Sequence, residues 1–187
     1  MSFIYEPKQD CSIDGFELLE DPLQCEVDKL ATKLGLNQIG MIYTDLQNDK
    51  DNPGKVICKR NSDSFFVSSL EAVFIAQMQL KNPSPCKFSS SGHFGSKYVT
   101  VIVTGDNEGQ VGLTEFQVSN SCMAMVDAGI IEPSIDPSLV LVKESSKTLY
   151  VPEVFYKDKN EYGVVVQSAA KPTFPVDYLL TRVTIIF

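Results

Sequence analysis

The segment from residue 36 to residue 80 constrains the fold most, because it predicts a strand, a polar loop and a helix in succession. Residues 38–46 are largely apolar and predict a buried strand, and residues 47–63 are polar and predict a loop. The helix that begins at Ser68 is apolar around most of its circumference. Because such a helix is usually buried on more than one side, we expect it to lie inside the fold. The mixture of predicted strands and helices along the chain predicts the α+β class.

Another helix is predicted between Asp21 and Gly35. Asp21 is a typical N-cap residue, and Pro22 suits the first helical position, where its missing N–H needs no partner. Apolar side chains then recur at helical spacing, and Gly35 can end the helix in the left-handed conformation. Before this helix, residues 4–7 predict the end of a strand and residues 8–20 predict a loop.

The middle of the chain predicts a β-hairpin and a short helix. Residues 97–104 are rich in β-branched residues and predict a strand. After a glycine-containing turn at residues 105–109, residues 110–118 predict the returning strand of a hairpin. Ser119 or Asn120 can cap the helix that follows, and Gly129 can end it.

From residue 130 onward, prolines separate short apolar runs. This pattern of short apolar runs is typical of short strands, and it differs from the longer helix and strand patterns of residues 1–129. We therefore expect two domains, residues 1–131 and a β-rich domain of residues 132–187.

Charge and cysteine content limit the possible partners and compartments. The chain has 187 residues and a net charge of −8, so phosphate backbones and anionic lipids would repel it and nucleic acid and membranes are poor candidates. No apolar run reaches the roughly 18–20 residues that span a bilayer, and the start lacks the features of a signal peptide. The five cysteines are dispersed, which favours reduced thiols in the cytosol or nucleus.

A candidate metal site lies where the strand predicted at residues 38–46 ends and the helix at Ser68 begins. Asp45 and Glu71 could bind a hard cation, whereas Tyr43 is a poor ligand because its phenol has a pKa near 10. His93 is the single histidine, which excludes a site with two imidazole ligands within the chain. Ser68 and Glu71 also match a capping box. We favour capping and expect no metal or other cofactor.

Two further segments are candidate binding surfaces. Residues 91–96 place a histidine and a phenylalanine between glycines, which suits either a tight connector or part of a peptide-binding groove. Residues 150–156 contain three aromatic side chains, which are most often core residues but are also enriched at interfaces. The candidate peptide-binding residues are His93, Phe94, Gly95, Lys97, Tyr150, Phe155 and Tyr156.

The strand end and helix start resemble those of the MPN/JAMM metalloproteases. In these enzymes the strand carries His-x-His-Pro, the helix start carries Ser-x-x-Asp, and together they hold zinc. Here Tyr43 and Asp45 stand at the histidine positions and Leu46 stands at the proline position, while Ser68 and Glu71 match the helix start. The scaffold thus resembles that of the enzyme, and the ligands do not.

Longer runs are more specific than general patterning. They include Ile-Tyr-Glu-Pro at 4–7, Thr-Asp-Leu at 44–46, Gly-His-Phe-Gly-Ser-Lys at 92–97, Gln-Val-Ser-Asn at 117–120 and Tyr-Val-Pro-Glu-Val-Phe-Tyr at 150–156. Together, and in this order, these runs resemble the nuclear protein localization protein 4 family over nearly the whole chain.

The resemblance implies an MPN-like, cytidine-deaminase-like layered domain that has lost its metal ligands, here incomplete at its N-terminus, followed by a C-terminal domain. It implies a non-catalytic adaptor that binds ubiquitin or polyubiquitin, with unfolded ubiquitin lying along a groove over both domains. Together with the ubiquitin fusion degradation partner, such an adaptor recruits substrates to the valosin-containing AAA ATPase for proteasomal and ER-associated degradation. The implied locations are the cytoplasm and the nucleus.

The resemblance does not include the ubiquitin-like domain and zinc-finger segments of full-length members, so ATPase docking is not assigned to this chain. Two alternatives stay open. One is a divergent metal-dependent deubiquitinase with metal at Asp45 and Glu71. The other is a purely structural subunit whose groove is covered by its partner.

Overall fold

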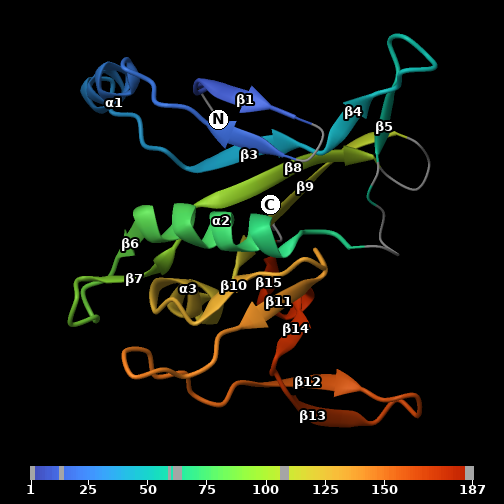
Figure 1. Ribbon diagram of the computed structural model, residues 1–187. Helices are drawn as coiled ribbons and strands as arrows, with labels where there is room; N and C mark the ends of the chain where they lie inside the picture. The colour runs from blue at the N-terminus through green and yellow to red at the C-terminus, as the bar shows by residue number, and fades with distance from the viewer. Residues whose placement is uncertain (1–2, 13–14, 59, 61–64, 106–109, 184–187) are drawn as a thin grey trace. The chain divides into compact units, whose positions relative to one another are not determined.

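The structure is a computed structural model that describes residues 3–12, 15–58, 60, 65–105 and 110–183 (Figure 1). The chain divides into two compact units, residues 1–39 and residues 40–187. No helix in the described part of the chain is long and apolar enough to cross a membrane.

The first unit contains an antiparallel hairpin of β1 (Gln9–Cys11) and β2 (Phe16–Leu18). The predictions of a strand end at residues 4–7 and a loop at residues 8–20 are therefore wrong. Strands of three residues are too short to display the alternation by which strands are recognised in a sequence.

Helix α1 (Gln24–Lys33) confirms the helix predicted between Asp21 and Gly35. Its start is displaced, because the Asp21 carboxylate accepts a hydrogen bond from the N–H of Leu23 and so caps a turn before the helix. Gly35 ends the helix as predicted, with a φ of 68°. The N–H of the following residue donates to the carbonyl of Ala31 at 2.9 Å, as in a Schellman motif.

A four-stranded sheet organises the second unit in the order β15 (Leu180–Arg182), β9 (Val111–Val118), β8 (Val99–Gly105) and β3 (Gly40–Thr44). β8 and β9 form the predicted antiparallel hairpin. Residues 106–109 of its predicted turn lie outside the described residues.

β3 pairs in parallel with β8 and lies at the edge of the sheet. Its Ile42 is exposed, so the prediction of a buried strand is wrong. An apolar run cannot distinguish an edge strand from a central one, because it carries no information on neighbouring strands. A Cβ atom at Gly40 would lie 2.1 Å from the carbonyl oxygen of Val99, so this pairing requires glycine.

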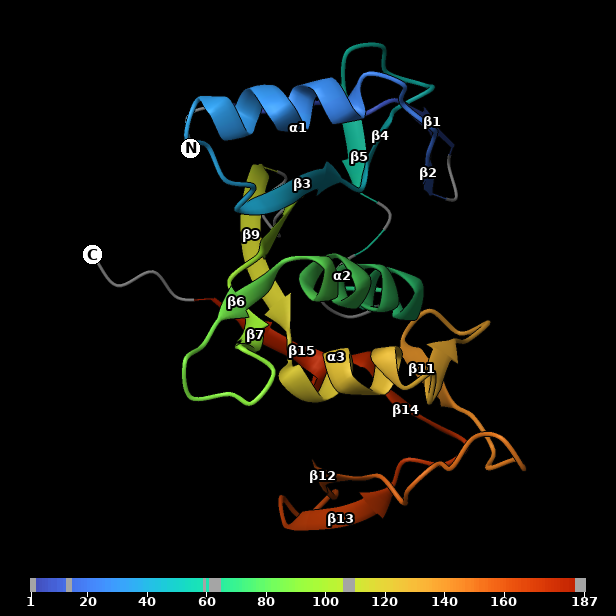
Figure 2. The ribbon, with the colours of Figure 1, turned by 90° about the vertical axis from the view of Figure 1, so that its left-hand side faces the viewer.

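Helix α2 (Ser69–Lys81) connects β3 to β8 and packs against α3 (Asn120–Asp127; Figure 2). One face of α2 is fully buried through Ala72, Ile75 and Gln79, whereas Leu70 is exposed. The helix is thus less completely covered than its apolar sequence predicts. α3 is capped by Ser119 and ends before Gly129, as predicted.

Four smaller antiparallel sheets complete the described part of the second unit. They are β4 (Leu46–Asn48) with β5 (Val56–Cys58), β6 (Pro83–Pro85) with β7 (His93–Ser96), β10 (Ile131–Pro133) with β11 (Leu139–Val142) and β14 (Thr173–Pro175), and β12 (Phe155–Lys159) with β13 (Val165–Ala169). A short 3-10 helix, η1 (Val176–Leu179), precedes β15.

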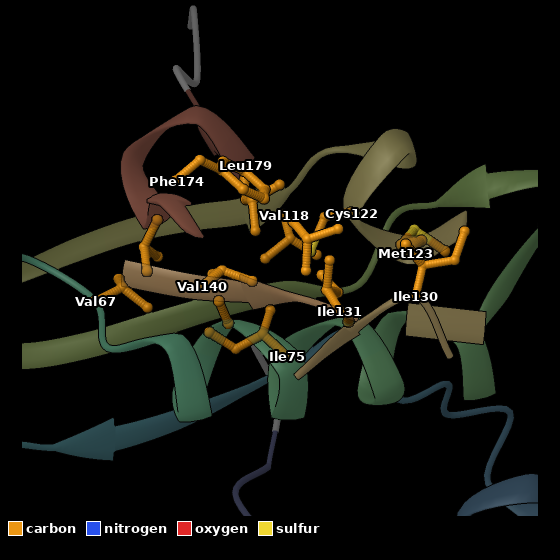
Figure 3. Packing of buried hydrophobic residues seen from close by; sticks show 14 of the residues in the cluster. Val67, Ile75, Val118, Cys122, Met123, Ile130, Ile131, Val140, Phe174 and Leu179 are labelled. Atoms are coloured by element: carbon orange, nitrogen blue, oxygen red, sulfur yellow. The ribbon is translucent and has the colours of Figure 1, made fainter. Parts of the chain in front are cut away.

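One hydrophobic core lies between α2, α3, the four-stranded sheet and β11 (Figure 3). Ile75 and Cys122 come from the helices, and Val140 and Phe174 come from the predicted C-terminal domain. The mixture of helices with mainly antiparallel strands agrees with the predicted α+β class. The boundary between residues 131 and 132 lies inside this shared core, and the division at that point stays a prediction.

Candidate functional site

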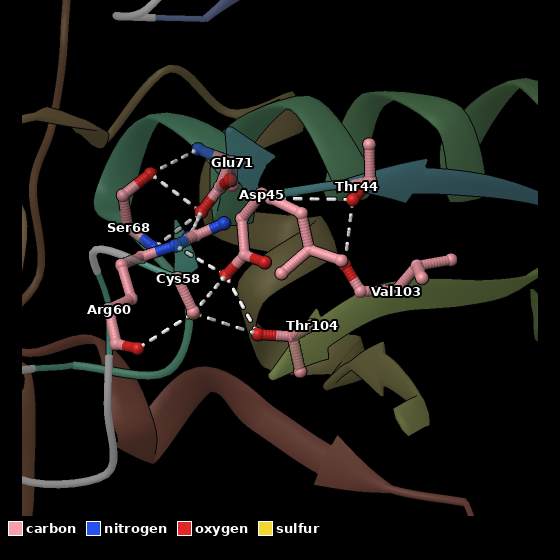
Figure 4. Close-up of polar contacts among 9 residues, drawn as sticks. Thr44, Asp45, Cys58, Arg60, Ser68, Glu71, Val103 and Thr104 are labelled. Carbon is pink, nitrogen blue, oxygen red and sulfur yellow. Dashed lines mark hydrogen bonds and ion pairs between the residues drawn. The ribbon is translucent and has the colours of Figure 1, made fainter. Parts of the chain in front are cut away.

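The end of β3 and the start of α2 lie beside each other and bring Tyr43, Asp45, Ser68 and Glu71 together, as Figure 4 shows for the last three. A helix that connects two parallel strands runs back along the sheet, so its N-terminus lies near the carboxyl end of the first strand. The fold therefore brings these four residues to one place, and their reading as a former metal site stays a prediction.

Ser68 and Glu71 form the predicted capping box. The N–H of Glu71 donates to Ser68 Oγ at 3.2 Å, and the N–H of Ser68 donates to Glu71 Oε2 at 2.8 Å. The Ser68 hydroxyl also donates to Glu71 Oε2, at 2.9 Å. Glu71 thus satisfies the first turn of the helix, while its carboxylate stays available for one more partner.

That partner is Arg60, which sequence inspection missed. Arg60 Nε lies 3.0 Å from Asp45 Oδ2, and Arg60 Nη1 lies 2.5 Å from Glu71 Oε2 (Figure 4). The exposed fractions of the three side chains are 14% for Arg60, 9% for Asp45 and 22% for Glu71. The guanidinium therefore bridges two carboxylates that come from different elements, in a largely buried setting. The one signal in the sequence was a basic pair, Lys59-Arg60, inside the predicted loop.

Neighbouring polar groups complete the cluster. The Thr104 hydroxyl donates to Asp45 Oδ2 at 3.0 Å, which adds β8 to the network. Cys58 Sγ donates to the backbone carbonyl of Arg60 at 2.8 Å and lies 3.3 Å from Thr104 Oγ1. These contacts hold the end of β5 and the Arg60 backbone against the sheet.

Electrostatics at the site favour a protonated Tyr43. Burial raises the pKa of Tyr43 well above its ordinary value of 10, and the negative charge of Glu71 raises it further. A phenol in this setting does not become a phenolate ligand at neutral pH. For Arg60, burial lowers the pKa, but the hydrogen bond and charge of Glu71 outweigh it and raise the pKa overall. The guanidinium remains charged.

The residues present do not fit the zinc site of an MPN protease. Such a site needs two imidazoles and a carboxylate, and here Tyr43 is protonated and Asp45 and Glu71 are both ion-paired with Arg60. Across the described residues, no cluster of three or more His, Cys, Asp or Glu side chains could hold a metal ion.

The first candidate binding segment lies on β7. Phe94 is 66% exposed, and His93 and Lys97 are exposed as well. Gly95 has a φ of 60°, a conformation that favours glycine, and a Cβ atom there would lie 3.0 Å from Asn120 Oδ1 and crowd that side chain. Gly95 therefore sets the backbone conformation of this segment, and the neighbouring Phe94 side chain faces solvent.

The second candidate segment leads into β12. Tyr150 is 82% exposed and Phe155 is 50% exposed, whereas Tyr156 is half-buried. The Tyr156 ring packs against the rings of Tyr178 and Phe174, with centroid distances of 4.9 Å and 6.2 Å. Tyr156 is therefore an anchor of the hairpin. β7 and β12 lie well apart in both Figure 1 and Figure 2, so the two candidate segments do not form one compact patch.

The whole chain is similar to one family of known proteins. The family model described as "NPL4 family" matches residues 1–187. "Nuclear protein localization protein 4" of Schizosaccharomyces pombe is 47% identical over 181 residues, which cover 97% of this chain and 32% of the relative. The proteins of that name from Yarrowia lipolytica and Saccharomyces cerevisiae are 45% and 42% identical, with 97% of this chain and 33% and 32% of the relatives covered. The chain spans about a third of the length of these curated relatives.

Proposed function

We propose the following function for this chain, which belongs to the NPL4 family: it is a non-catalytic module that binds ubiquitin or polyubiquitin. In this role it helps to bring ubiquitin-marked proteins to the valosin-containing AAA ATPase. The proposal includes an MPN-like domain without metal chemistry at residues 1–131 and a C-terminal domain at residues 132–187.

One observation carries the binding part of the proposal: Phe94, Tyr150 and Phe155 expose their aromatic rings. Aromatic side chains are more often buried, and exposed ones concentrate at interfaces, where they supply much of the binding energy. All three lie in the two runs of sequence that most specifically resemble the family, at residues 92–97 and 150–156.

The mode of binding that suits these segments is capture of an extended peptide. β12 and β13 form a two-stranded sheet, and β6 and β7 form another, so both present strand edges. An extended peptide can add to such an edge through backbone hydrogen bonds, while aromatic side chains beside it hold alternate residues of the peptide.

The non-catalytic part of the proposal rests on Arg60. Its guanidinium is already paired with Asp45 and Glu71, the two carboxylates that a divergent metalloprotease would need. The single histidine of the chain cannot replace the missing imidazole pair.

The partners of the whole protein follow from the family alone and belong to the same proposal. They are the ubiquitin fusion degradation partner subunit and the AAA ATPase, in proteasomal and ER-associated degradation in the cytoplasm and nucleus. Since this chain covers about a third of its relatives, docking on the ATPase is not assigned to it.

The test is incubation of the purified chain with polyubiquitin, with retention and cleavage scored in the same sample. Retention without cleavage is expected. Phe94→Ala and Tyr150→Ala should each lower retention, and Ile135→Ala, which removes a fully exposed side chain outside both segments, serves as the control.

The other outcomes decide between the alternatives. Cleavage that a chelator abolishes would establish a metal-dependent deubiquitinase. If the sample shows no retention and no cleavage, the result favours a structural subunit. Equal retention by Ile135→Ala and the two aromatic variants would place the binding surface elsewhere on the chain.

A further inference from the structure

We infer that the Arg60 guanidinium is a built-in replacement for a metal ion: it supplies, from within the chain, the positive charge that Asp45 and Glu71 would otherwise share with a bound cation. The inference concerns this cluster and does not depend on ubiquitin binding.

The contacts of Arg60 resemble the bridging of ligands by a cation. Two different nitrogens, Nε and Nη1, reach two carboxylates at 3.0 Å and 2.5 Å. These carboxylates follow β3 and begin α2, so they approach each other only through the fold. Arg60 is therefore the shared centre of the cluster (Figure 4).

Burial makes this charge necessary. Two carboxylates that share a largely dry site repel each other, and a cation that lies between them offsets this repulsion. Asp45 is 9% exposed, and its Oδ1 atom has no hydrogen-bond partner among the described residues. The positive charge of Arg60 thus holds the two carboxylates together.

The same guanidinium opposes metal binding. A divalent cation would have to enter beside an existing positive charge and compete with Arg60 for Asp45 Oδ2 and Glu71 Oε2. Removal of that charge leaves two carboxylates, and such oxygen donors suit hard ions such as Mn²⁺. We therefore expect a latent cation site that Arg60 keeps closed.

The experiment compares Arg60→Met with Lys143→Met in thermal unfolding, with and without millimolar Mn²⁺. Methionine keeps an unbranched apolar stem in each case and removes the charge. Lys143 forms the matched control, because its 3.5 Å ion pair with Glu132 is much more exposed. The loss of a partly buried pair predicts that Arg60→Met lowers Tm by about 6–12 °C. Lys143→Met should lower Tm by about 2 °C or less.

Mn²⁺ provides the readout that a merely structural arginine would not change. It should raise the Tm of Arg60→Met by about 4 °C or more and leave the wild-type chain and Lys143→Met unchanged. The electron paramagnetic resonance spectrum of Mn²⁺ should report bound ion in Arg60→Met alone.

Three results would overturn the inference: equal losses of Tm in the two methionine variants, a Mn²⁺ response as large in the wild type as in Arg60→Met, or no Mn²⁺ response in Arg60→Met. If Arg60→Met does not fold, Arg60→Lys decides. It retains the charge, so it should fold and ignore Mn²⁺, and stabilisation of this variant by Mn²⁺ would equally contradict the inference.

Discussion

The core beside α2 and the hairpin of β12 and β13 are both rich in aromatic and β-branched side chains, but they expose these side chains very differently. Phe116 in the core is 2% exposed, whereas Phe155 in the hairpin is 50% exposed. Ile75 and Val140 in the core are fully buried, and Val165 in β13 is exposed. Residue type is therefore a poor guide to which of the two regions stabilises the fold.

The hairpin is held to the body of the second unit by one of its two faces. Tyr156 packs against Tyr178 and Phe174, and alternation along β12 directs Phe155 and Lys157 to the opposite face. A two-stranded hairpin is marginal by itself, so this anchored face supplies the stability and the other face is available for binding. The comparison predicts that substitutions in the core affect folding, while those on the outer hairpin face affect recognition.

The largest effect is expected from Phe116→Ala. Its ring is buried on β9 and meets the ring of Phe66 edge-on, with a centroid distance of 5.4 Å. Deletion of a buried phenylalanine ring should lower the free energy of unfolding by about 3–5 kcal/mol. Urea denaturation measures this change, and a loss below about 1 kcal/mol would show that this part of the core can collapse around the deletion.

Gln79→Leu should have the next largest effect, because it breaks a buried polar contact without emptying the core. The side-chain amide of Gln79 donates to the Val118 carbonyl at 3.1 Å and accepts from the Val118 N–H at 2.7 Å, as a neighbouring strand would. Leucine leaves both backbone groups unpaired, which should cost about 2–3 kcal/mol in urea denaturation. Gln77→Leu on the exposed side of α2 is the control, and equal losses in the two variants would contradict the role of the contact.

Local chemistry made several elements predictable from the sequence. Ser68, Ser119 and Gly129 act through bonds to residues within a few positions, so their helix ends could be placed without knowledge of the fold. The hairpin of β8 and β9 was equally accessible, because β-branched residues dominate β8 and a glycine-containing turn separates the two strands in the sequence.

Features that depend on distant parts of the chain could not be predicted. Arg60 lies inside a polar loop, and its role appears only when the fold brings Asp45 and Glu71 to it. The edge position of β3 depends on how the other strands pair. The exposure of Phe155 likewise follows from which face of β12 is anchored, which its aromatic character did not reveal.

Ser68→Ala is expected to have a smaller effect than either core substitution. It removes the acceptor for the Glu71 N–H, which should lower the free energy of unfolding by about 1 kcal/mol. Ser68→Thr retains a hydroxyl and is the matched control, with a loss of less than about 0.5 kcal/mol in urea denaturation. If threonine is as damaging as alanine, packing around residue 68 matters more than capping.

The smallest effect on stability is expected from Phe155→Ala, although its effect on binding should be large. The ring lies on the outer face of β12 and is half in solvent already, so its deletion should change the free energy of unfolding by about 0.5 kcal/mol or less. If the proposed function is correct, the same variant should weaken polyubiquitin binding about tenfold or more, as truncation of an aromatic interface residue does.

Tyr156→Ala is the matched comparison for Phe155→Ala, because it removes the neighbouring aromatic ring from the anchored face. It should destabilise the chain by more than Phe155→Ala does in urea denaturation, since it loses the packing against Tyr178 and Phe174. The reverse pattern, in which Phe155→Ala destabilises the chain and leaves polyubiquitin binding intact, would make the outer face structural. In that case the outer face of β12 would stabilise the fold as the core does, and the proposed division between a stabilising core and a hairpin that recognises a partner would be wrong.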